Sequence, residues 1–315
     1  MEIIEVNNIQ YAEIFLHPYH IFNDANFNYL NRDKCESIKY LLFKDKKYKL
    51  GLISGIKNQK LISPFSSPFG SFSFIKSDIQ ISSIEKAINE LDNYCRINEL
   101  TDIEFILPPL FYDEKFLSKL INVLFRKNYL IYNIDLDFYF KTDNFQNKYI
   151  ESIWYNARKN LNQAINKGFK FNLCSNLEDI NSVYQIIQEN RLNINKPLNM
   201  SLKQIIDTSK IIKTDLFLLS YENVNIASAV VYFVTDEIVY IPFWADKPGF
   251  SELRPMNFLA YKIFEYYSLN KVRIVHIGIS TENSIPNYGL CEFKESIGCE
   301  ITPKLSFIKH LIKQE

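Results

Sequence analysis

The chain has 315 residues, of which 47% are hydrophobic, and its 36 basic residues balance its 36 acidic residues. This length and composition predict a globular protein with a large core and about two domains. A formal charge of zero argues against a broad surface for nucleic acid or anionic membranes, while a local basic groove stays open. We therefore expect no DNA partner.

The amino terminus, Met1-Glu-Ile-Ile-Glu-Val6, lacks the basic region and the apolar run of a signal peptide. An uninterrupted apolar stretch of about 18 residues does not occur, so we expect no integral membrane segment. The five cysteines are odd in number and scattered, which fits a reducing compartment. The histidines form no metal-ligand pattern beyond a conceivable His17/His20 pair. The sequence predicts a cytoplasmic protein without a metal site.

The first part of the chain predicts one α/β unit that begins after residue 37. Short apolar runs around charged turns predict a strand meander, and helical spacing of apolar residues predicts two helices. Ser63-Pro-Phe-Ser-Ser-Pro-Phe-Gly-Ser71 contains prolines and a glycine, so it predicts a shaped loop. The expected strands are 38–43, 50–56, 60–62, 103–107 and 129–140, and the expected helices are 81–97 and about 117–125.

The element order then repeats after a helical middle piece at about residues 145–200. That piece predicts helices over 149–167, 177–190 and 201–209, with a strand over 169–174. The repeated unit predicts strands over 215–221, 226–234, 238–243, 272–277 and 301–308, with helices over 255–269 and around 293–294. We infer a duplicated α/β domain, with boundaries at 1–145 and 146–315, the second including the linking helices.

Meander, helix, strand, helix and strand is the order of elements in the GNAT acyltransferase fold. With the duplication, three segments resemble the FemAB/FemX-like branch of that superfamily: the helix 158–168, the start Arg254-Pro-Met-Asn257, and 287–298. The resemblance covers about His17 to Phe307 and is sharpest at Phe293-Lys294 followed by Gly298. It implies two tandem GNAT-like domains with mixed central sheets.

The resemblance implies an acyltransferase that moves an acyl or aminoacyl group to an amine or hydroxyl. Relatives that build peptidoglycan take an amino acid from aminoacyl-tRNA, and other relatives use acyl-CoA. In that family the Phe-Lys pair lies close to the reacting centre, so Lys294 inherits the role of stabilising the acyl group, with Phe293 beside it. Arg158, and less clearly Lys159, match a basic residue that contacts acceptor phosphate.

Several residues suggest the same chemistry without the family. Pro242 cannot donate to a sheet ladder, so the strand around it is expected to bulge or splay and leave backbone groups for an extended ligand. Tyr240 and Trp244 flank this break and are candidate walls for it, with core packing an equally good interpretation. Tyr288, in the segment 287–298, is a further candidate for binding substrate.

The segment Arg254-Pro-Met-Asn257 predicts a helix start that can hold an anion. Proline is well tolerated in a first turn, and the unpaired amides there attract phosphate. Arg254 and Asn257 are therefore candidates for binding the donor. The glycine-rich pyrophosphate loop of acetyl-CoA-using GNAT enzymes is missing, and only Gly249 precedes the helix.

The sequence shows no serine or cysteine with a recognisable base partner, so we expect direct attack rather than a covalent acyl-enzyme. Glu292, Glu295 and Asp246 are near the candidate site in sequence, and none stands out as a general base. The long helical hairpin that some cell-wall relatives insert is also absent between residues 145 and 215, which disfavours a tRNA donor.

The sequence thus predicts a bacterial FemAB-like acyltransferase of cell-envelope biogenesis. Its expected acceptor is a small molecule or nucleotide-linked sugar precursor, with acyl-CoA ranked slightly ahead of aminoacyl-tRNA as donor. The alternatives are an aminoacyl-tRNA-dependent peptidoglycan-type ligase and a catalytically inactive GNAT tandem that acts as a binding module. The acyl group, the acceptor, the general base and the oligomeric state stay open.

Overall fold

The computed structural model describes residues 1–145, 148–174 and 176–311 and divides into two compact units. Unit 1 comprises Met1–Leu136 and the chain from Thr302 onward, and unit 2 comprises Asp137–Ile301. Residues from Thr302 onward, expected in the second domain, belong to unit 1, where Ser306–His310 pair with β6.

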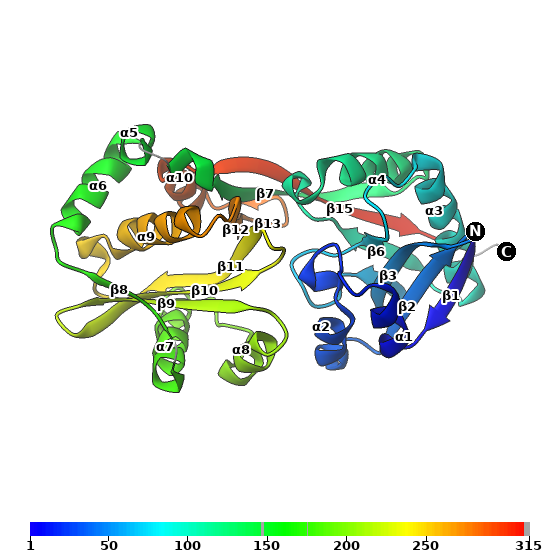
Figure 1. Ribbon diagram of the computed structural model, residues 1–315, viewed down its shortest axis with the longest axis horizontal. Coiled ribbons are helices and arrows are strands. Elements are labelled where there is room, and N and C mark those ends of the chain that lie inside the picture. Colours follow the sequence, from blue (N-terminus) through cyan, green and yellow to red (C-terminus); the bar gives the residue numbers. More distant parts are fainter. Residues whose placement is uncertain (146–147, 175, 312–315) are drawn as a thin grey trace. The chain divides into compact units, whose positions relative to one another are not determined.

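Unit 1 has a mixed sheet in the order β1-β2-β3-β4-β6-β15, with β5 also pairing with β3 (Figure 1). Only β4 and β6 run parallel among these pairs. The chain passes from one unit to the other within β7, after Leu136, and within β15, after Ile301. The bounds are β1 Glu2–Val6, β2 Ser37–Lys44, β3 Tyr48–Lys57, β4 Lys60–Ser63, β5 Phe72–Phe74, β6 Asp102–Ile106, β7 Leu130–Lys141 and β15 Glu300–His310.

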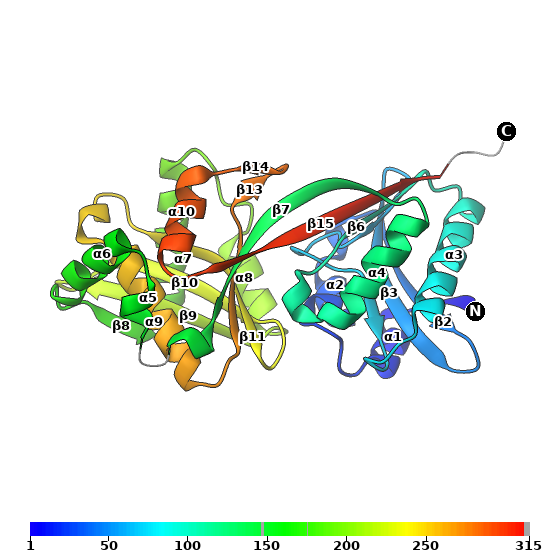
Figure 2. The ribbon, with the colours of Figure 1, turned by 90° about the horizontal axis from the view of Figure 1, so that it is seen from above.

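Helices cover both faces of the unit 1 sheet. One face packs against α3 and α4, which lie side by side, in a core that includes Leu91, Phe105 and Leu120 (Figure 2). The other face packs against α1 and α2 through Tyr11 and Phe15. The helices are α1 Asn8–Ile14, α2 Ala25–Leu30, α3 Ile81–Ile97 and α4 Glu114–Arg126, with the 3₁₀ turns η1 Ile21–Asn23, η2 Arg32–Lys34 and η3 Leu110–Tyr112.

The expectation that residues 1–37 are irregular is wrong. The strand β1 pairs with β2 as an edge strand, and α1 begins with a capping box in which Asn7 and Gln10 satisfy each other's amides. Asp24 caps α2 in the same region. Tyr11 and Phe15 form part of a core, so the aromatic and polar composition of this segment concealed an amphipathic helix.

The strands of unit 2 belong to the same mixed sheet, in the order β7-β12-β11-β10-β9-β8. Its only parallel pair in that order is β11 with β12. A short hairpin, β13 with β14, follows β12. The bounds are β8 Lys170–Leu173, β9 Thr214–Tyr221, β10 Val224–Phe233, β11 Ile238–Asp246, β12 Ile274–Ile279, β13 Thr281–Glu282 and β14 Ile285–Pro286.

The helices of unit 2 also lie on both sides of its sheet. Figure 1 shows α7 and α8 on one side and α9 on the other, and α7 and α9 both contact β10. The helices are α5 Tyr149–Ser152, α6 Tyr155–Ile165, α7 Leu177–Asn193, α8 Leu202–Ser209, α9 Pro255–Leu269 and α10 Tyr288–Ser296, with η4 Thr142–Phe145 and η5 Ser251–Leu253. The predicted mixed α/β architecture is confirmed.

The single helix expected over residues 149–167 is instead two helices, α5 and α6. The helix is interrupted at Ile153 and Trp154, and the Trp154 amide donates to the carbonyl of Ser296. Trp154 is half exposed rather than part of the apolar face, which consists of Ala157, Leu161 and Ala164. Across the part of the chain that the structure describes, no helix is both long and apolar enough to cross a membrane.

His20 is the most unusual buried side chain of unit 1. Its ring lies among aromatic rings, and both of its nitrogens are buried without a hydrogen-bond partner among the described residues. Burial lowers the pKa of His20 from 6.5 to about 3. The surrounding rings are Tyr19, Phe22, Phe69 and Tyr112.

Burial of neutral His20 makes the stability of the fold depend on pH. Because the folded pKa lies below the unfolded value, the stabilising contribution is present above pH 6.5 and is lost as the pH falls from there toward 3. In this window the free energy of unfolding of the wild type should fall by about 1.4 kcal/mol for each pH unit of acidification. We expect His20→Phe to abolish this pH dependence. Urea unfolding between pH 7 and 4.5 measures it, with exposed His17→Gln as control. Parallel pH profiles for wild type and His20→Phe would refute the assignment.

Candidate functional site

The parallel pair β11 and β12 opens near its middle in unit 2. Its register joins Ile238 to Ile274, Val239 to Val275 and Tyr240 to His276, and no later residues of the two strands. The strand β11 nevertheless continues to Asp246. The β12-facing edge of β11 beyond Tyr240 therefore lies outside this ladder, where its backbone groups can pair with an extended ligand.

Pro242 lies where the pairing of β11 with β10 is also irregular. The register with β10 shifts between Val230 and Tyr232, so that Ile241 and Pro242 together face Val231. Two residues opposite one is the count of a β-bulge, and proline has no amide hydrogen to give to either ladder. The bulge predicted from Pro242 is confirmed.

The helix that follows β11 begins with the predicted anion-binding segment. Arg254 immediately precedes α9, has a left-handed backbone with φ +60°, and provides no side-chain cap to the first turn. Pro255 is the first helical residue, and Asn257 in the first turn is only 8% exposed. The first-turn amides of a helix have no partner within the helix, and the Arg254 side chain does not cap them here.

The guanidinium of Arg254 is only partly engaged at this helix start. Its Nη2 lies 3.7 Å from the carboxylate of the exposed Glu252, and its Nε is buried without a partner among the described residues. A buried donor of this kind is costly unless a ligand or water accepts from it. The arrangement favours an anionic group at the start of α9.

A buried acidic and basic pair lies beside the last residue of the parallel register. His276 Nε2 is 2.7 Å from Asp137 Oδ1, and each side chain is 1% exposed. The Asp137 carboxylate also accepts from the amide of Phe138. The partly buried ring of Tyr240 lies against the His276 ring at 4.7 Å, and burial together with the Asp137 charge raises the pKa of Tyr240.

Lys294 is almost fully buried, with 2% exposure, and its ammonium is fixed at the end of β12. Nζ donates to the carbonyl oxygens of Ile277, Gly278 and Ile279 at 3.0, 2.8 and 3.1 Å. Burial lowers the pKa of Lys294 from 10.5 to about 8, while the charge of Asp137 acts in the opposite direction. All three ammonium protons are directed at backbone carbonyls, so Lys294 ties α10 to the end of β12.

Gly278 allows this strand end to adopt its shape. Its φ is +73°, and a Cβ built there would lie 3.3 Å from the Tyr240 ring. The register of β12 with β7 also shifts between His276 and Gly278. A glycine is needed here both for the left-handed backbone and for the close approach of Tyr240.

The remaining predicted residues of 287–298 lie on α10. Phe293 is partly buried and its ring lies 6.2 Å from that of Trp244 on β11, which brings these two predicted residues together. Tyr288, at the first position of α10, is 74% exposed. Figure 2 shows α10 next to the β13–β14 hairpin, and Gly298, with φ +88°, follows the helix end as predicted.

Arg158 and Lys159 lie on α6, where they line an open hollow of about 350 Å³. Its other lining residues are Tyr155, Asn162, Gln163 and Asn166, so that amides and two cations share one surface. Such a surface can hold a phosphate by charge and hydrogen bonds. Among the described residues of unit 2, no interaction joins Arg158 or Lys159 to Lys294 or Tyr240.

Asp137 and His276 are the site residues that sequence reasoning missed. Asp137 was recognised only as a polar residue in an alternating strand, and His276 as a histidine without a metal pattern. The available signal was a charged or titratable side chain within an otherwise apolar strand, since such groups are buried only when they are paired. Among the described residues, no group of three or more potential metal ligands is found.

The matching position of unit 1 is filled by protein. There the parallel register of β4 with β6 ends at Ser63 and Phe105, and the loop 64–71 follows. The Gly70 amide donates to the carbonyl of Ile106, and the Ser71 amide donates to Ser63 Oγ. A Cβ on Gly70 would lie 2.9 Å from the Pro64 nitrogen, so this loop packs tightly on itself. Only unit 2 combines an open strand pair with the predicted site residues.

The three carbonyl contacts of Lys294 generate a stability prediction. Lys294→Met keeps the apolar stem but removes the donors to three carbonyls at the end of β12. We expect a loss of about 2–5 kcal/mol in the free energy of unfolding. Urea denaturation measures it, with the half-buried Lys262→Met on α9 as control. Unchanged stability would show that the ammonium serves a ligand rather than the strand.

Neither the family models nor the curated proteins include a match to this sequence. Solved structures do match. FemX superposes with a TM-score of 0.71 at 10% identity, covering 100% of this chain and 98% of that one. A C-terminal domain from Agrobacterium fabrum, named as part of a putative lysylphosphatidylglycerol synthetase, gives a TM-score of 0.62 at 11% identity, covering 96% of this chain and 92% of that one.

A tandem GNAT protein from the clavulanic acid biosynthesis pathway also matches over 100% of this chain and 99% of its own, with a TM-score of 0.57 at 6% identity. At such identities the likeness concerns the fold. The resemblance to FemAB/FemX-like proteins, drawn from the sequence, is thereby confirmed for the fold. The chain has the FemX-type tandem GNAT fold.

Proposed function

We propose that this chain is an acyltransferase that moves an acyl or aminoacyl group from an activated donor to an amine or hydroxyl of an acceptor. The reaction centre is the open end of the β11–β12 pair in unit 2. The observation that carries the proposal is the parallel register that stops at Tyr240 and His276 while β11 continues. An acyl-CoA donor is favoured slightly over aminoacyl-tRNA.

The open strand edge suits an extended thioester. The pantetheine arm of a coenzyme A ester carries amide groups that can pair with β11 beyond Tyr240, as an added strand would. The start of α9, with its uncapped amides and the partly engaged Arg254, lies directly after β11 in the chain and offers a place for the diphosphate. Asn257 in the first turn is the second predicted contact.

The transfer itself needs no covalent enzyme intermediate. The acceptor nitrogen or oxygen attacks the acyl carbonyl, a new C–N or C–O bond forms, the thioester C–S bond breaks, and the proton of the acceptor ends on the thiol. Backbone amides of β11 outside the ladder can stabilise the oxyanion. Lys294 holds the end of β12 in place, and direct contact of Lys294 or Phe293 with the acyl group remains a proposal.

The Tyr240, His276 and Asp137 group lies at the same point. The Tyr240 hydroxyl can donate to the departing sulfur or accept the acceptor proton, and the ring of His276, which pairs with Asp137, lies against the Tyr240 ring. Asp246, at the end of β11, has a pKa raised by burial, and the amide of Asn190 lies 3.4 Å from its carboxylate. Tyr240 is the better placed of the two for proton transfer because it borders the opening.

The acceptor is proposed to be a nucleotide-linked sugar or another phosphate-bearing cell-envelope precursor of bacteria, met in the cytoplasm. The support is the hollow on α6, where Arg158 and Lys159 lie among amide side chains. Two cations that line one hollow match a diphosphate better than a neutral sugar. Tyr288 and Trp244 offer aromatic surfaces for the same substrate.

An aminoacyl donor is the alternative that a specific finding supports. One matching structure is named FemX, and another is named as part of a putative lysylphosphatidylglycerol synthetase, a name that joins a lysyl group to a phospholipid. The tests below therefore also distinguish an acyl-CoA donor from an aminoacyl-tRNA donor, and an enzyme from an inactive binding module.

Binding of the donor is the first test. Titration with coenzyme A, acetyl-CoA and a longer acyl-CoA is expected to raise the stability of the protein by about 2.7 kcal/mol at 100 times the dissociation constant, visible as a thermal shift. Arg254→Gln is expected to weaken binding about tenfold or more, because it removes a charged contact to phosphate. The matched control is Arg273→Gln, at the opposite end of β12.

The result that would sink the coenzyme A donor is the absence of any shift with all three thioesters. Aminoacyl-tRNA would then be the next donor to test. An equal shift in wild type and Arg254→Gln would still support a thioester donor. It would contradict the placement of the donor's diphosphate at the start of α9.

Acyl transfer can be separated from donor binding at Tyr240. We expect Tyr240→Phe to lower kcat by roughly 10²-fold while thioester binding changes little, because only the hydroxyl is lost. Transfer to a panel of amine acceptors, followed by mass spectrometry, measures it. Tyr232→Phe, on β10 in the same unit, is the control. Full activity in Tyr240→Phe would exclude its hydroxyl from proton transfer.

A further inference from the structure

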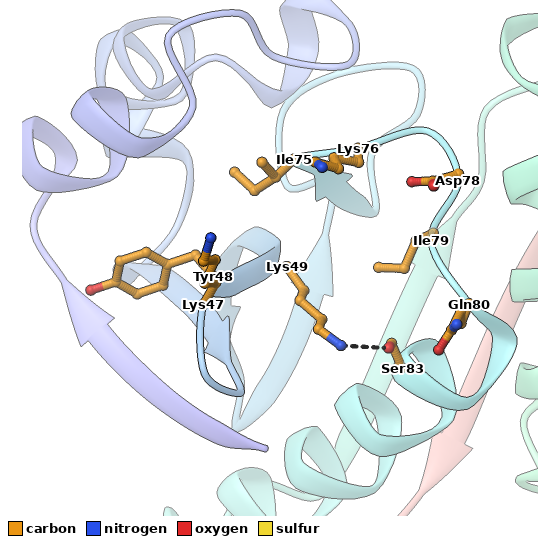
Figure 3. Close-up of a pocket in the computed structure, with 9 residues that line it drawn as sticks. All are labelled: Lys47, Tyr48, Lys49, Ile75, Lys76, Asp78, Ile79, Gln80 and Ser83. Atoms are coloured by element: carbon orange, nitrogen blue, oxygen red, sulfur yellow. Dashed lines mark hydrogen bonds between the residues drawn. The ribbon is translucent and has the colours of Figure 1, made fainter.

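A separate pocket lies in unit 1, away from every residue predicted for catalysis. It has a volume of about 360 Å³ and is lined by the β2–β3 hairpin, the segment after β5 and the start of α3 (Figure 3). Its lining residues are Lys47, Tyr48, Lys49, Ile75, Lys76, Asp78, Ile79, Gln80 and Ser83. The volume is within the range of pockets that hold small ligands.

The charges around the pocket are mainly positive. Lys47, Lys49 and Lys76 line it, against the single carboxylate of Asp78. One further carboxylate acts nearby, since Asp45 Oδ2 lies 3.6 Å from Lys49 Nζ. The three lysines of the lining outnumber these two carboxylates, which favours an anion.

Lys49 is held in place at the start of α3. Its Nζ donates to Ser83 Oγ at 3.2 Å, and Figure 3 shows the lysine reaching across the pocket to the helix. Ser83 is only 5% exposed, so this hydroxyl is a built part of the pocket rather than a mobile surface group. Because Ser83 accepts from the lysine, its own proton remains to be donated toward a ligand.

The start of α3 adds to this arrangement. The helix has 17 residues, Gln80 gives its first turn no side-chain cap, and the first turn contains no acidic residue. Uncapped amides at a long helix start attract negative charge. The ammonium of Lys49, the hydroxyl of Ser83 and the amides at the start of α3 therefore lie together. The pocket also has an apolar wall, formed by Ile75, Ile79 and Tyr48.

We propose that this pocket binds a phosphate or diphosphate group attached to a larger, partly apolar ligand. The ligand is held and not acylated there, because the loop 64–71 fills the strand opening of unit 1. The chemistry is shared by a soluble nucleotide or sugar phosphate and by a phospholipid headgroup. The site is distinct from the start of α9, and its occupancy does not depend on acyl transfer.

The test uses the full chain in an Arg254→Gln, Arg158→Gln and Lys159→Gln background, so that neither the start of α9 nor the hollow on α6 contributes. Calorimetric titration with inorganic pyrophosphate is expected to show one site. Lys49→Met is expected to weaken it about tenfold or more, and Ser83→Ala roughly fivefold. Exposed Lys76→Gln provides a variant that does not disturb the helix, and Lys86→Gln, on α3 outside the pocket, is the control.

A second arm distinguishes the source of the phosphate. Flotation with phosphatidylcholine vesicles, with and without phosphatidic acid, reports binding to a headgroup, and pyrophosphate reports a soluble ligand. Binding in either arm that falls in Lys49→Met and Lys76→Gln, with Lys86→Gln unchanged, supports the pocket. Absence of binding in both arms, or binding that these two variants leave unchanged, overturns it.

Discussion

The early end of the β11–β12 ladder is the constraint on which the proposed site depends. Pro242 cannot donate to a sheet and lies in a bulge, so the β12-facing edge of β11 lies outside the ladder after Tyr240, while β11 pairs with β10 again from Phe243. At the end of β12 the buried ammonium of Lys294 donates to the carbonyls of Ile277, Gly278 and Ile279. The opening is thus maintained by one proline and one lysine on separate elements.

The two units show how a duplicated fold diverges. Both contain a single parallel strand pair, and in both the following helix starts near that pair. In unit 1 the loop 64–71 occupies the position where the strands separate, whereas in unit 2 β11 runs on with its edge open. At the end of the parallel pair, unit 1 therefore has a packed loop and unit 2 has a bulged strand with an open edge.

Sequence reasoning succeeded where local pattern decides structure. The helix over 81–97 and the bulge at Pro242 follow from apolar spacing and from the missing proline amide. It failed where the determining contact is distant in the chain. Asp137 meets His276 across 139 positions, and the three acceptors of Lys294 are backbone carbonyls that no residue type reveals.

Amide hydrogen exchange with and without an acyl-CoA tests the central claim most directly, since it reports where backbone groups become paired. The account predicts slower exchange in residues 241–246 of β11 and in the first turn of α9 when the thioester binds, with the loop 64–71 of unit 1 unchanged. Protection confined to unit 1, or thioester binding that leaves 241–246 exchanging at the free rate, would contradict the placement of the donor on the open edge of β11.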